Sequence, residues 1–274
     1  MQNKKNIAVV IPAYNEQDTV GGVVSGIPRA KLGTTSVVVV DDGSTDQTSR
    51  VAEKSGADEI IRFPENRGLG VAFKKGIEKA LELNADIIVN IDADMQFNPK
   101  DIPKLIDPLI KENADVVVCS RFLNKKLEPS MPWIKKMGNK IFSNLISVLT
   151  GVKLTDSQCG FRAYTRQAAQ RINIFSTYTY TQESLIDLIE KGMKIKEVAC
   201  KVKGERKGQS KVVDSIFKYT LRSLAILTRT IRDYRALEFF GTIGASIFTL
   251  GTTIAAAMLL RWIKTGTTTP YQSL

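Results

Sequence analysis

The stretch VVVVDDGSTD, residues 37–46, decides the fold that this chain adopts. An unbroken run of valines is typical of a parallel strand that is buried on both faces, and an acidic turn follows it directly. The segment IIVNIDADMQ, residues 87–96, repeats this arrangement. Because ligands of open α/β sheets bind beyond the carboxyl ends of the strands, both turns are candidate binding loops. Each turn taken alone is also explained as ordinary solvated turn chemistry.

Strand and helix patterns alternate outward from these two segments over the first 120 residues. Apolar runs predict strands at 7–11, 36–40, 59–63, 86–91 and 115–120, with helical patterns between them at 16–27, 46–55, 70–83 and 99–111. This alternation predicts a doubly wound, mostly parallel α/β sheet with right-handed crossovers. Past Arg121 the strand rhythm weakens, and residues 133–149 predict an amphipathic helix. The apolar residues of this helix, which we expect to pack into the core, are Ile134, Met137, Ile141, Leu145 and Val148.

Composition limits the chemistry. The 274 residues carry 39 Lys and Arg against 28 Asp and Glu, and the formal net charge of +11 indicates an anionic partner. The absence of histidine excludes His-based triads, His general bases and His-rich zinc sites. A bound metal is therefore expected to be a hard ion held by oxygen atoms. The cysteines are three in number and far apart, so they offer no disulfide framework and favour a reducing cytosol.

One segment is long and apolar enough to cross a membrane. Residues 239–260 run for 22 positions without a charge, and about 20 apolar residues span a hydrocarbon core of ~30 Å. A buried core helix rich in Gly and Ala is the alternative. The preceding residues 212–234 predict an amphipathic helix whose basic side chains Lys218, Arg222 and Arg229 face either anionic lipid headgroups or water. The excess of Lys and Arg before the span predicts that the N-terminal part is cytosolic.

Asp92 and Asp94 are separated by one residue at the end of the second acidic strand. Two carboxylates this close repel each other when nothing compensates their charge. A divalent metal with bound phosphates would relieve the repulsion, because both side chains can approach one cation.

Four motifs follow the predicted strands in the order PAYNE (12–16), DDGSTD (41–46), NRGLG (66–70) and DADMQ (92–96). This ordered combination resembles the family 2 glycosyltransferases of the GT-A fold, and more closely the branch similar to dolichyl-phosphate mannosyl- and glucosyltransferases. The likeness covers about residues 7–211, because SRF (120–122), DSQCGFR (156–162) and GERKGQSK (204–211) extend it into the acceptor half.

The resemblance implies a donor site. Asp92, Asp94 and Gln96 would hold Mg²⁺ or Mn²⁺ and the diphosphate, with Ala93 in the same binding set. Because the metal stabilises the leaving diphosphate, Asp94 is assigned a catalytic role. Gly68 and Gly70 resemble a phosphate-binding loop, and a plain turn before a helix also explains them. The residues implied to line the nucleotide pocket are Pro12, Tyr14, Glu16, Val40, Asp41 and Asp42.

Basic side chains are candidates for binding the phosphates of donor and acceptor, because guanidinium and ammonium groups match such anions. These candidates are Arg121, which we also assign a catalytic role, Lys135, Arg206 and Lys211. A solvated surface charge is the alternative for each. Glu183 is either the base for a hydroxyl acceptor or a first-turn helix carboxylate that the helix dipole favours.

The expected organisation is a catalytic domain at 1–211, with a nucleotide-sugar half at 1–120 and an acceptor half at 121–211. A juxtamembrane helix at 212–235, a transmembrane helix at 237–263 and a tail at 264–274 follow. The expected reaction, in protein glycosylation, moves one sugar from a UDP- or GDP-linked donor to dolichyl or polyprenyl phosphate. It would proceed with inversion at the cytosolic face of the cell membrane, or of the endoplasmic reticulum in a eukaryote.

The alternative function is a membrane polysaccharide synthase or a transferase that uses a hydroxyl acceptor. Synthases of that kind carry a Gln-x-x-Arg-Trp motif, and here Met258 stands where the glutamine would precede Arg261 and Trp262. We expect no nucleic-acid partner, because the basic residues gather beside the apolar span and form no recognition motif.

Overall fold

The computed structural model describes residues 5–202, 224–226, 228–230 and 232–266. The chain divides into two compact units, Met1–Thr220 and Leu221–Leu274. Arg206, Lys211, Lys218 and Arg222, which were singled out from the sequence, lie outside the described residues. Predictions that depend on these four residues therefore stay predictions, as do the domain boundaries.

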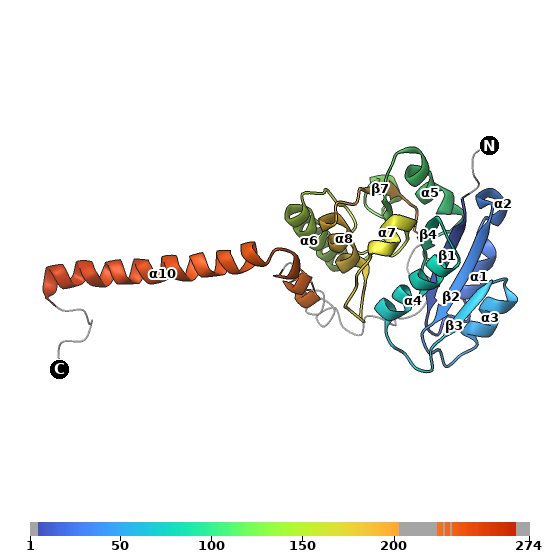
Figure 1. Cartoon of the computed structure of the whole chain (residues 1–274), viewed down its shortest axis with the longest axis horizontal. Helices are drawn as coiled ribbons and strands as arrows, with labels where there is room; N and C mark the ends of the chain where they lie inside the picture. The colour runs from blue at the N-terminus through green and yellow to red at the C-terminus, as the bar shows by residue number, and fades with distance from the viewer. Residues whose placement is uncertain (1–4, 203–223, 227, 231, 267–274) are drawn as a thin grey trace. The chain divides into compact units, whose positions relative to one another are not determined.

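The first unit alternates strands and helices along the chain (Figure 1). Its first half contains β1 (Ile7–Ala13), α1 (Val20–Gly26), α2 (Arg29–Leu32), β2 (Thr35–Asp41), α3 (Thr48–Lys54), β3 (Glu59–Arg62), α4 (Leu69–Glu82), β4 (Ile87–Asn90), η1 (Pro99–Asp101), α5 (Ile102–Lys111) and β5 (Val116–Ser120). Its second half contains η2 (Lys125–Leu127), α6 (Trp133–Thr150), β6 (Arg162–Thr165), α7 (Arg166–Arg171), α8 (Thr181–Glu190) and β7 (Ile195–Ala199).

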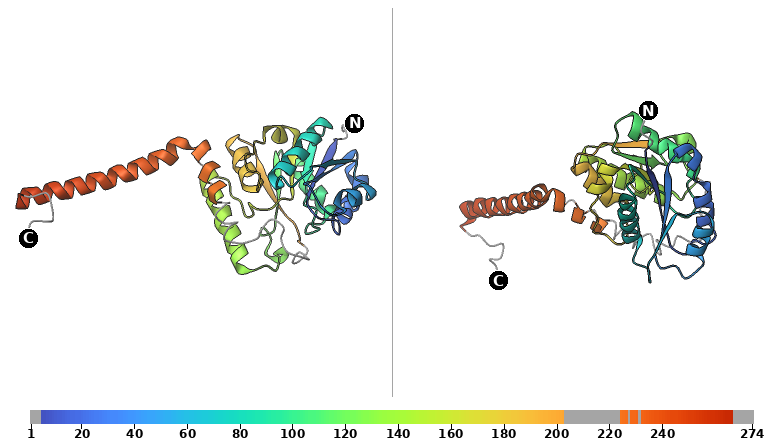
Figure 2. Two further views of the ribbon diagram at one scale, coloured as in Figure 1. Left: turned by 90° about the horizontal axis from the view of Figure 1, so that it is seen from below. Right: turned by 45° about the vertical axis from the view of Figure 1, so that its right-hand side comes forward.

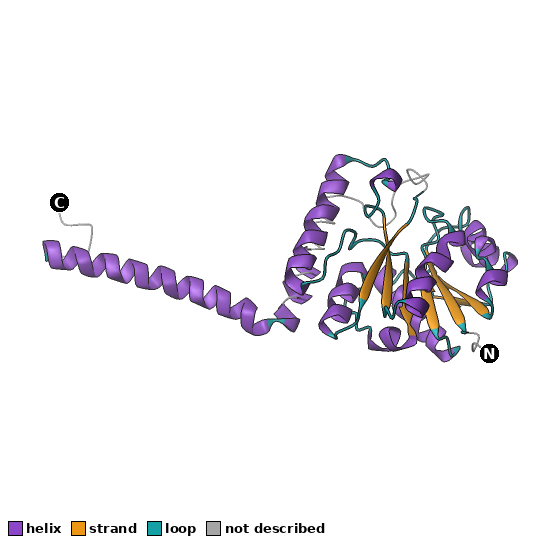
Figure 3. Cartoon of the chain, turned by 90° about the horizontal axis from the view of Figure 1, so that it is seen from above, coloured by secondary structure: helices purple, strands orange, loops and turns teal. Residues whose placement is uncertain are grey.

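The seven strands form one sheet in the order β3-β2-β1-β4-β6-β5-β7. The neighbouring pairs β1–β2, β1–β4, β2–β3 and β5–β7 are parallel, while β6 runs antiparallel to both β4 and β5. Helices cover both faces of this sheet (Figures 2 and 3). The predicted doubly wound, mostly parallel sheet is confirmed, with β6 as the inserted antiparallel strand.

The register of the sheet positions the acidic turns. Ala13 at the end of β1 pairs with Asp41 at the end of β2, and Asn90 at the end of β4 pairs with Val10 of β1. Because these three strands are parallel, their carboxyl ends lie along one edge. The residues of β1 and β4 and most of β2 are buried, as their Val and Ile runs predict. The loops that follow the three strands therefore start from a rigid core.

Helix α6 forms where the sequence predicts it, but the expectation that its apolar stripe packs into the core is wrong. Ile134, Met137, Ile141 and Val148 are 44%, 47%, 56% and 82% exposed, and Leu145 is half-buried. The buried side chains of α6 are Asn139, Phe142, Ser143 and Ile146. Two of these are polar and bond to the loop after the helix, since Asn139 Nδ2 donates to the Thr155 carbonyl at 3.3 Å and Ser143 Oγ accepts from the Ser157 amide at 2.9 Å. Hydrogen bonding, not apolarity alone, thus decides which face turns inward.

This orientation predicts unequal effects of two alanine substitutions in α6. Ile146→Ala removes a fully buried side chain and is expected to cost about 2–5 kcal/mol of stability. Ile141→Ala changes an exposed position and is expected to stay within about 0.5 kcal/mol. Thermal denaturation of the full chain in detergent, followed by circular dichroism, measures both. Equal losses from the two substitutions would contradict the orientation.

The second unit contains α10 (Ala236–Thr265), a helix of 30 residues. At about 1.5 Å per residue, α10 is long enough to cross a bilayer. An 18-residue stretch of this helix has a mean hydropathy of 1.8, and none of the residues in that stretch is buried. The hydroxyl groups within residues 239–260 all donate back to helix carbonyls: Thr242, Ser246, Thr249, Thr252 and Thr253. Such internal satisfaction suits a helix in hydrocarbon. Helix α10 is therefore a candidate transmembrane span.

Candidate active site

The loops after β1 and β2, both predicted to line the nucleotide pocket, are joined by hydrogen bonds. The Asn15 amide donates to Ser44 Oγ at 2.9 Å, and Asn15 Oδ1 accepts from the Thr45 amide at 2.8 Å. The Glu16 amide donates to Thr48 Oγ1 at 2.8 Å. Asn15 has a φ of 52°, a left-handed conformation that asparagine tolerates. The two motifs PAYNE and DDGSTD thus form one structural unit.

Asp41 and Asp42 organise this unit from within. Asp41 is fully buried, and its carboxylate accepts from the Ser44 amide at 2.8 Å and from the Ser49 hydroxyl. Asp42 accepts from the Arg67 amide at 2.7 Å and the Gly68 amide at 2.9 Å. Burial raises the pKa of Asp42, against the lowering effect of these two amide bonds. Both carboxylates therefore shape the loops that surround the predicted pocket.

The other predicted pocket residues differ in exposure. Pro12 and Val40 pair across β1 and β2, and both are buried. Tyr14 and Glu16 are half-buried. Among the residues predicted to line the pocket, Tyr14 and Glu16 are therefore the two whose side chains reach solvent.

Gly68 and Gly70 lie against the segment that precedes α8. A Cβ on Gly70 would lie 2.1 Å from the Ser176 carbonyl oxygen, and one on Gly68 would lie 2.4 Å from the Thr177 carbonyl oxygen. The Gly70 amide donates to that Thr177 oxygen at 2.9 Å. Close backbone packing explains both glycines, which favours the turn over the phosphate-binding loop.

The third loop, DADMQ, carries the predicted metal ligands. Asp92, Asp94 and Gln96 are half-buried, while Ala93 is only 3% exposed. Asp94 Oδ1 accepts from the Gln96 amide at 3.0 Å, and Met95 between them has a φ of 58°. This tight turn leaves the two carboxylates on one short loop next to β1.

The donor set of this loop fits a hard cation whose coordination is completed by phosphate. Among the described residues, no group of three or more His, Cys, Asp or Glu side chains could hold a metal by itself. Mg²⁺ commonly takes one or two carboxylates together with waters and substrate phosphates, and Asp92 with Asp94 supplies that number.

Arg121, directly after β5, pairs with a buried carboxylate that the sequence interpretation gave no role. Its Nε and Nη2 donate to the two oxygens of Asp156 at 2.6 and 2.8 Å, and the Asp156 side chain is fully buried. The Asp156 amide in turn donates to Glu197 Oε1 at 2.9 Å. Burial raises the pKa of Glu197. Asp156 was visible in the motif DSQCGFR, but only the fold shows that it fixes the guanidinium of Arg121.

Glu183 is 6% exposed, and its carboxylate is held by the backbone. One oxygen accepts from the Phe175 amide at 3.0 Å and the other from the Ser176 amide at 3.1 Å. The residue therefore anchors the segment that packs on Gly70, and its role as a base stays a prediction. Lys135 is exposed on the first turn of α6, and its role in binding phosphate stays a prediction.

A cluster that the sequence interpretation missed lies beside Asp92 and contains Asn90, Gly160 and Tyr180. Asn90, fully buried at the end of β4, donates through Nδ2 to the Gly160 carbonyl at 2.9 Å and to the Tyr180 hydroxyl at 2.7 Å. Tyr180 directly precedes α8 and is also fully buried. The signal was present only as the uncharged polar Asn within an apolar strand.

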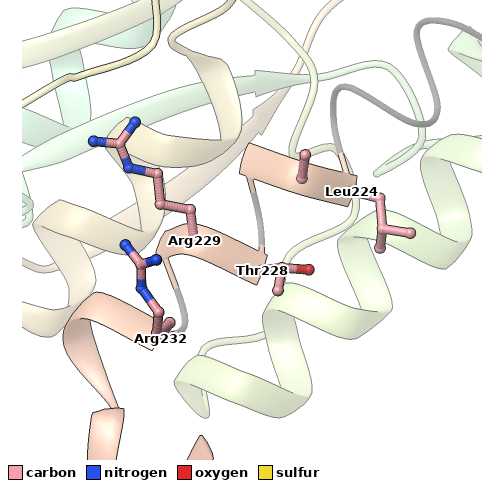
Figure 4. Close-up of a pocket in the computed structure, with 5 residues that line it drawn as sticks. Leu224, Thr228, Arg229 and Arg232 are labelled. Carbon is pink, nitrogen blue, oxygen red and sulfur yellow. The ribbon is translucent and has the colours of Figure 1, made fainter.

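The second unit has a pocket of its own, close to the start of α10 in the chain. Figure 4 shows the guanidinium groups of Arg229 and Arg232 on the same side of this pocket. Leu224, Ala225 and Thr228 complete its lining. Arg232 pairs with Asp233 at 2.6 Å. None of the residues predicted to bind the donor lines this pocket.

Comparison with known proteins agrees with this architecture. The family model described as "Glycosyl transferase family 2" matches residues 8–172. A UDP-N-acetylglucosamine–dolichyl-phosphate N-acetylglucosaminyltransferase of Methanococcus voltae is 34% identical over 216 residues, which cover 72% of this chain and 85% of the relative. A dolichyl-phosphate hexose transferase of Haloferax volcanii is 34% identical over 207 residues, which cover 76% of this chain and 86% of the relative.

A solved structure shares the fold. The glucosyl-3-phosphoglycerate synthase of Mycobacterium tuberculosis, crystallised with Mn²⁺, UDP and glucosyl-3-phosphoglycerate, superposes with a TM-score of 0.66 at 24% identity. The match covers 82% of this chain and 80% of that one. The sheet is thus GT-A-like, as the sequence predicts, and the enzyme is a glycosyltransferase. On the sequence match over more than half of its length, the chain belongs to glycosyl transferase family 2.

Proposed function

We propose that this enzyme transfers a single sugar from a nucleoside-diphosphate sugar to a polyprenyl or dolichyl phosphate, at the cytosolic face of a membrane. The observation that carries the proposal is the convergence of three loops at one sheet edge. The loops after β1 and β2 are hydrogen-bonded to each other, and the carboxylates of Asp92 and Asp94 follow the neighbouring strand β4. The two relatives named above, which by their names use dolichyl phosphate, support the choice of acceptor.

The donor side of the reaction depends on charge. A Mg²⁺ or Mn²⁺ bound with the diphosphate would neutralise the charge that develops on the leaving group. Asp92 and Asp94 would hold that ion, and the Mn²⁺ and UDP in the structural neighbour support this assignment. Tyr14 and Glu16 would contact the nucleotide from the loop after β1, while Asp41 and Asp42 keep the surrounding loops in place.

The acceptor side needs little proton chemistry. A phosphate monoester is largely ionised near neutral pH, so its oxygen can attack once it is positioned and its charge is balanced. A hydroxyl acceptor would need a base, and the carboxylate of Glu183 is already engaged by two backbone amides. This engagement favours the lipid phosphate over a hydroxyl acceptor.

Two surfaces support a location at a lipid bilayer. Helix α10 supplies the candidate span. The exposed apolar face of α6 carries Trp133 at its start, and Lys140 lies beside that face. Tryptophan and lysine around an apolar stripe suit the interface between headgroups and acyl chains.

Removing α10 is expected to release the protein from integral membrane association. A chain that ends at Arg235 should appear in the soluble fraction after carbonate extraction, whereas the full chain stays with the lipid, because the apolar span is lost.

In right-side-out vesicles we expect protease to leave the N-terminal unit of the full chain intact. Digestion of that unit in sealed right-side-out vesicles would refute the cytosolic orientation.

The function itself is tested with donor sugars. Membranes containing the full chain are incubated with radiolabelled UDP- and GDP-sugars and polyprenyl phosphate, and the lipid is extracted. One of the donors is expected to give labelled lipid in the presence of Mg²⁺ or Mn²⁺. Label that appears only in water-soluble products would reject the lipid acceptor.

A further inference from the structure

The backbone of Gly160 lies against the Asp92 carboxylate. A Cβ built on Gly160 would be 3.0 and 3.1 Å from the two carboxylate oxygens of Asp92 and 2.8 Å from the Tyr180 hydroxyl. Gly160 is not among the residues with positive φ, so backbone conformation does not require a glycine here. Space requires it, because any side chain would enter the gap that Asp92 and Tyr180 share.

The Tyr180 hydroxyl is held in this gap by hydrogen bonds. It accepts from Asn90 Nδ2 at 2.7 Å, and it lies 3.2 Å from the Gly160 carbonyl, to which it donates. Asn90 Nδ2 donates to the same carbonyl at 2.9 Å. Three polar groups from β4, from the loop before β6 and from the start of α8 therefore converge next to Asp92.

The supporting structure is rigid. The Tyr180 ring stacks on Phe73 of α4 with centroids 3.8 Å apart and an interplanar angle of 2°, and both side chains are fully buried. The fully buried Arg162 donates to the carbonyls of Cys159 at 2.7 Å and Ser157 at 3.0 Å, which fixes the loop that carries Gly160. Neither Tyr180 nor Gly160 can move far without disturbing the core.

We propose that Tyr180 and Gly160 are positioning residues for the metal-binding carboxylate of Asp92. The Tyr180 hydroxyl holds the backbone of Gly160 in place beside that carboxylate, and the missing side chain of Gly160 leaves the carboxylate room to face the cation. Groups around a metal ligand that fix its orientation commonly change metal affinity by about 10–100-fold when they are removed. The inference rests on the proposed metal site at Asp92 and Asp94.

The test measures Mn²⁺ binding by the full chain in detergent, by isothermal titration calorimetry with UDP and, separately, with GDP. Tyr180→Phe keeps the ring on Phe73 but removes the hydroxyl, and we expect Mn²⁺ affinity to fall about 10–100-fold. The matched control is Tyr164→Phe. Tyr164 is also fully buried, and the centroid of its ring lies 6.1 Å from that of Phe73. The control is expected to bind Mn²⁺ like the wild type. Thermal denaturation without metal verifies that each variant is folded.

Gly160→Ala adds a methyl group between Asp92 and Tyr180, and its Mn²⁺ affinity is expected to fall at least as far. If that variant does not fold, Tyr180→Phe alone decides. Wild-type affinity in Tyr180→Phe, or an equal loss in Tyr164→Phe, would overturn the positioning role. Asp94→Asn separates this failure from that of the metal site: if Asp94→Asn binds Mn²⁺ as tightly as the wild type, the metal site itself is wrong.

Discussion

Asp94→Asn is expected to lower the rate of sugar transfer by about 10²- to 10³-fold at saturating Mg²⁺ or Mn²⁺. The substitution removes one negative charge from the proposed metal site, and the charge stabilisation of a leaving group is worth several kcal/mol. The fold should survive, because Asp94 Oδ1 accepts from the Gln96 amide and an asparagine oxygen accepts the same bond. Initial rates with the labelled donor, compared at several metal concentrations, measure the effect.

The matched control for Asp94→Asn is Asp107→Asn. Asp107 lies on α5, its side chain is 58% exposed, and it pairs across one helix turn with Lys111 at 3.3 Å. We expect its rate to match the wild type. Near-normal turnover of Asp94→Asn would remove Asp94 from the catalytic site.

Asp156→Ala is expected to cost about 3–5 kcal/mol of stability, because it leaves the guanidinium of Arg121, 18% exposed, without its carboxylate. The midpoint of urea denaturation of the full chain in detergent, followed by circular dichroism, measures the loss. The control is Glu78→Ala, which breaks an exposed pair with Lys75 and is expected to cost less than about 1 kcal/mol.

A second variant tests the reason for this loss. If the penalty comes from an unpaired buried charge, Arg121→Leu combined with Asp156→Ala should be more stable than Asp156→Ala alone. A double variant whose loss equals the sum of the two single losses would show that the charge pair is not coupled.

Strands β1, β2, β4 and β5 could be predicted because most of their residues are buried and apolar. Runs such as Val37–Val40 and Ile87–Val89 satisfy the hydrophobic pattern by themselves, and the acidic loops follow at their ends. The antiparallel β6 and the parallel β7 were not predicted, since RAYT contains no apolar run and the residues of β7, IKEVA, alternate with charged side chains and are only half-buried. Short strands of this kind are specified by their neighbours in the sheet, which the sequence does not show.

The polar contacts around the site depend on pairs that are distant along the chain. Arg121 meets Asp156 across 35 positions, and Asn90 meets Tyr180 across 90. Local patterns carry no information about such pairs. The same limit explains the error in α6, where hydrogen bonds from the loop at 155–157 turn Asn139 and Ser143 inward in place of the apolar stripe.

The acceptor assay tests the central claim most directly. The wild-type chain receives the UDP- or GDP-sugar that labels lipid in the membrane assay, together with three acceptors in one reaction: polyprenyl phosphate, an oligosaccharide and 3-phosphoglycerate. The products are separated by thin-layer chromatography and identified by mass spectrometry. We predict one product, a lipid phosphate that carries a single sugar, formed about 10²- to 10³-fold more slowly by Asp94→Asn. A lengthened oligosaccharide or glycosylated phosphoglycerate, with no sugar on the lipid, would contradict the proposed function.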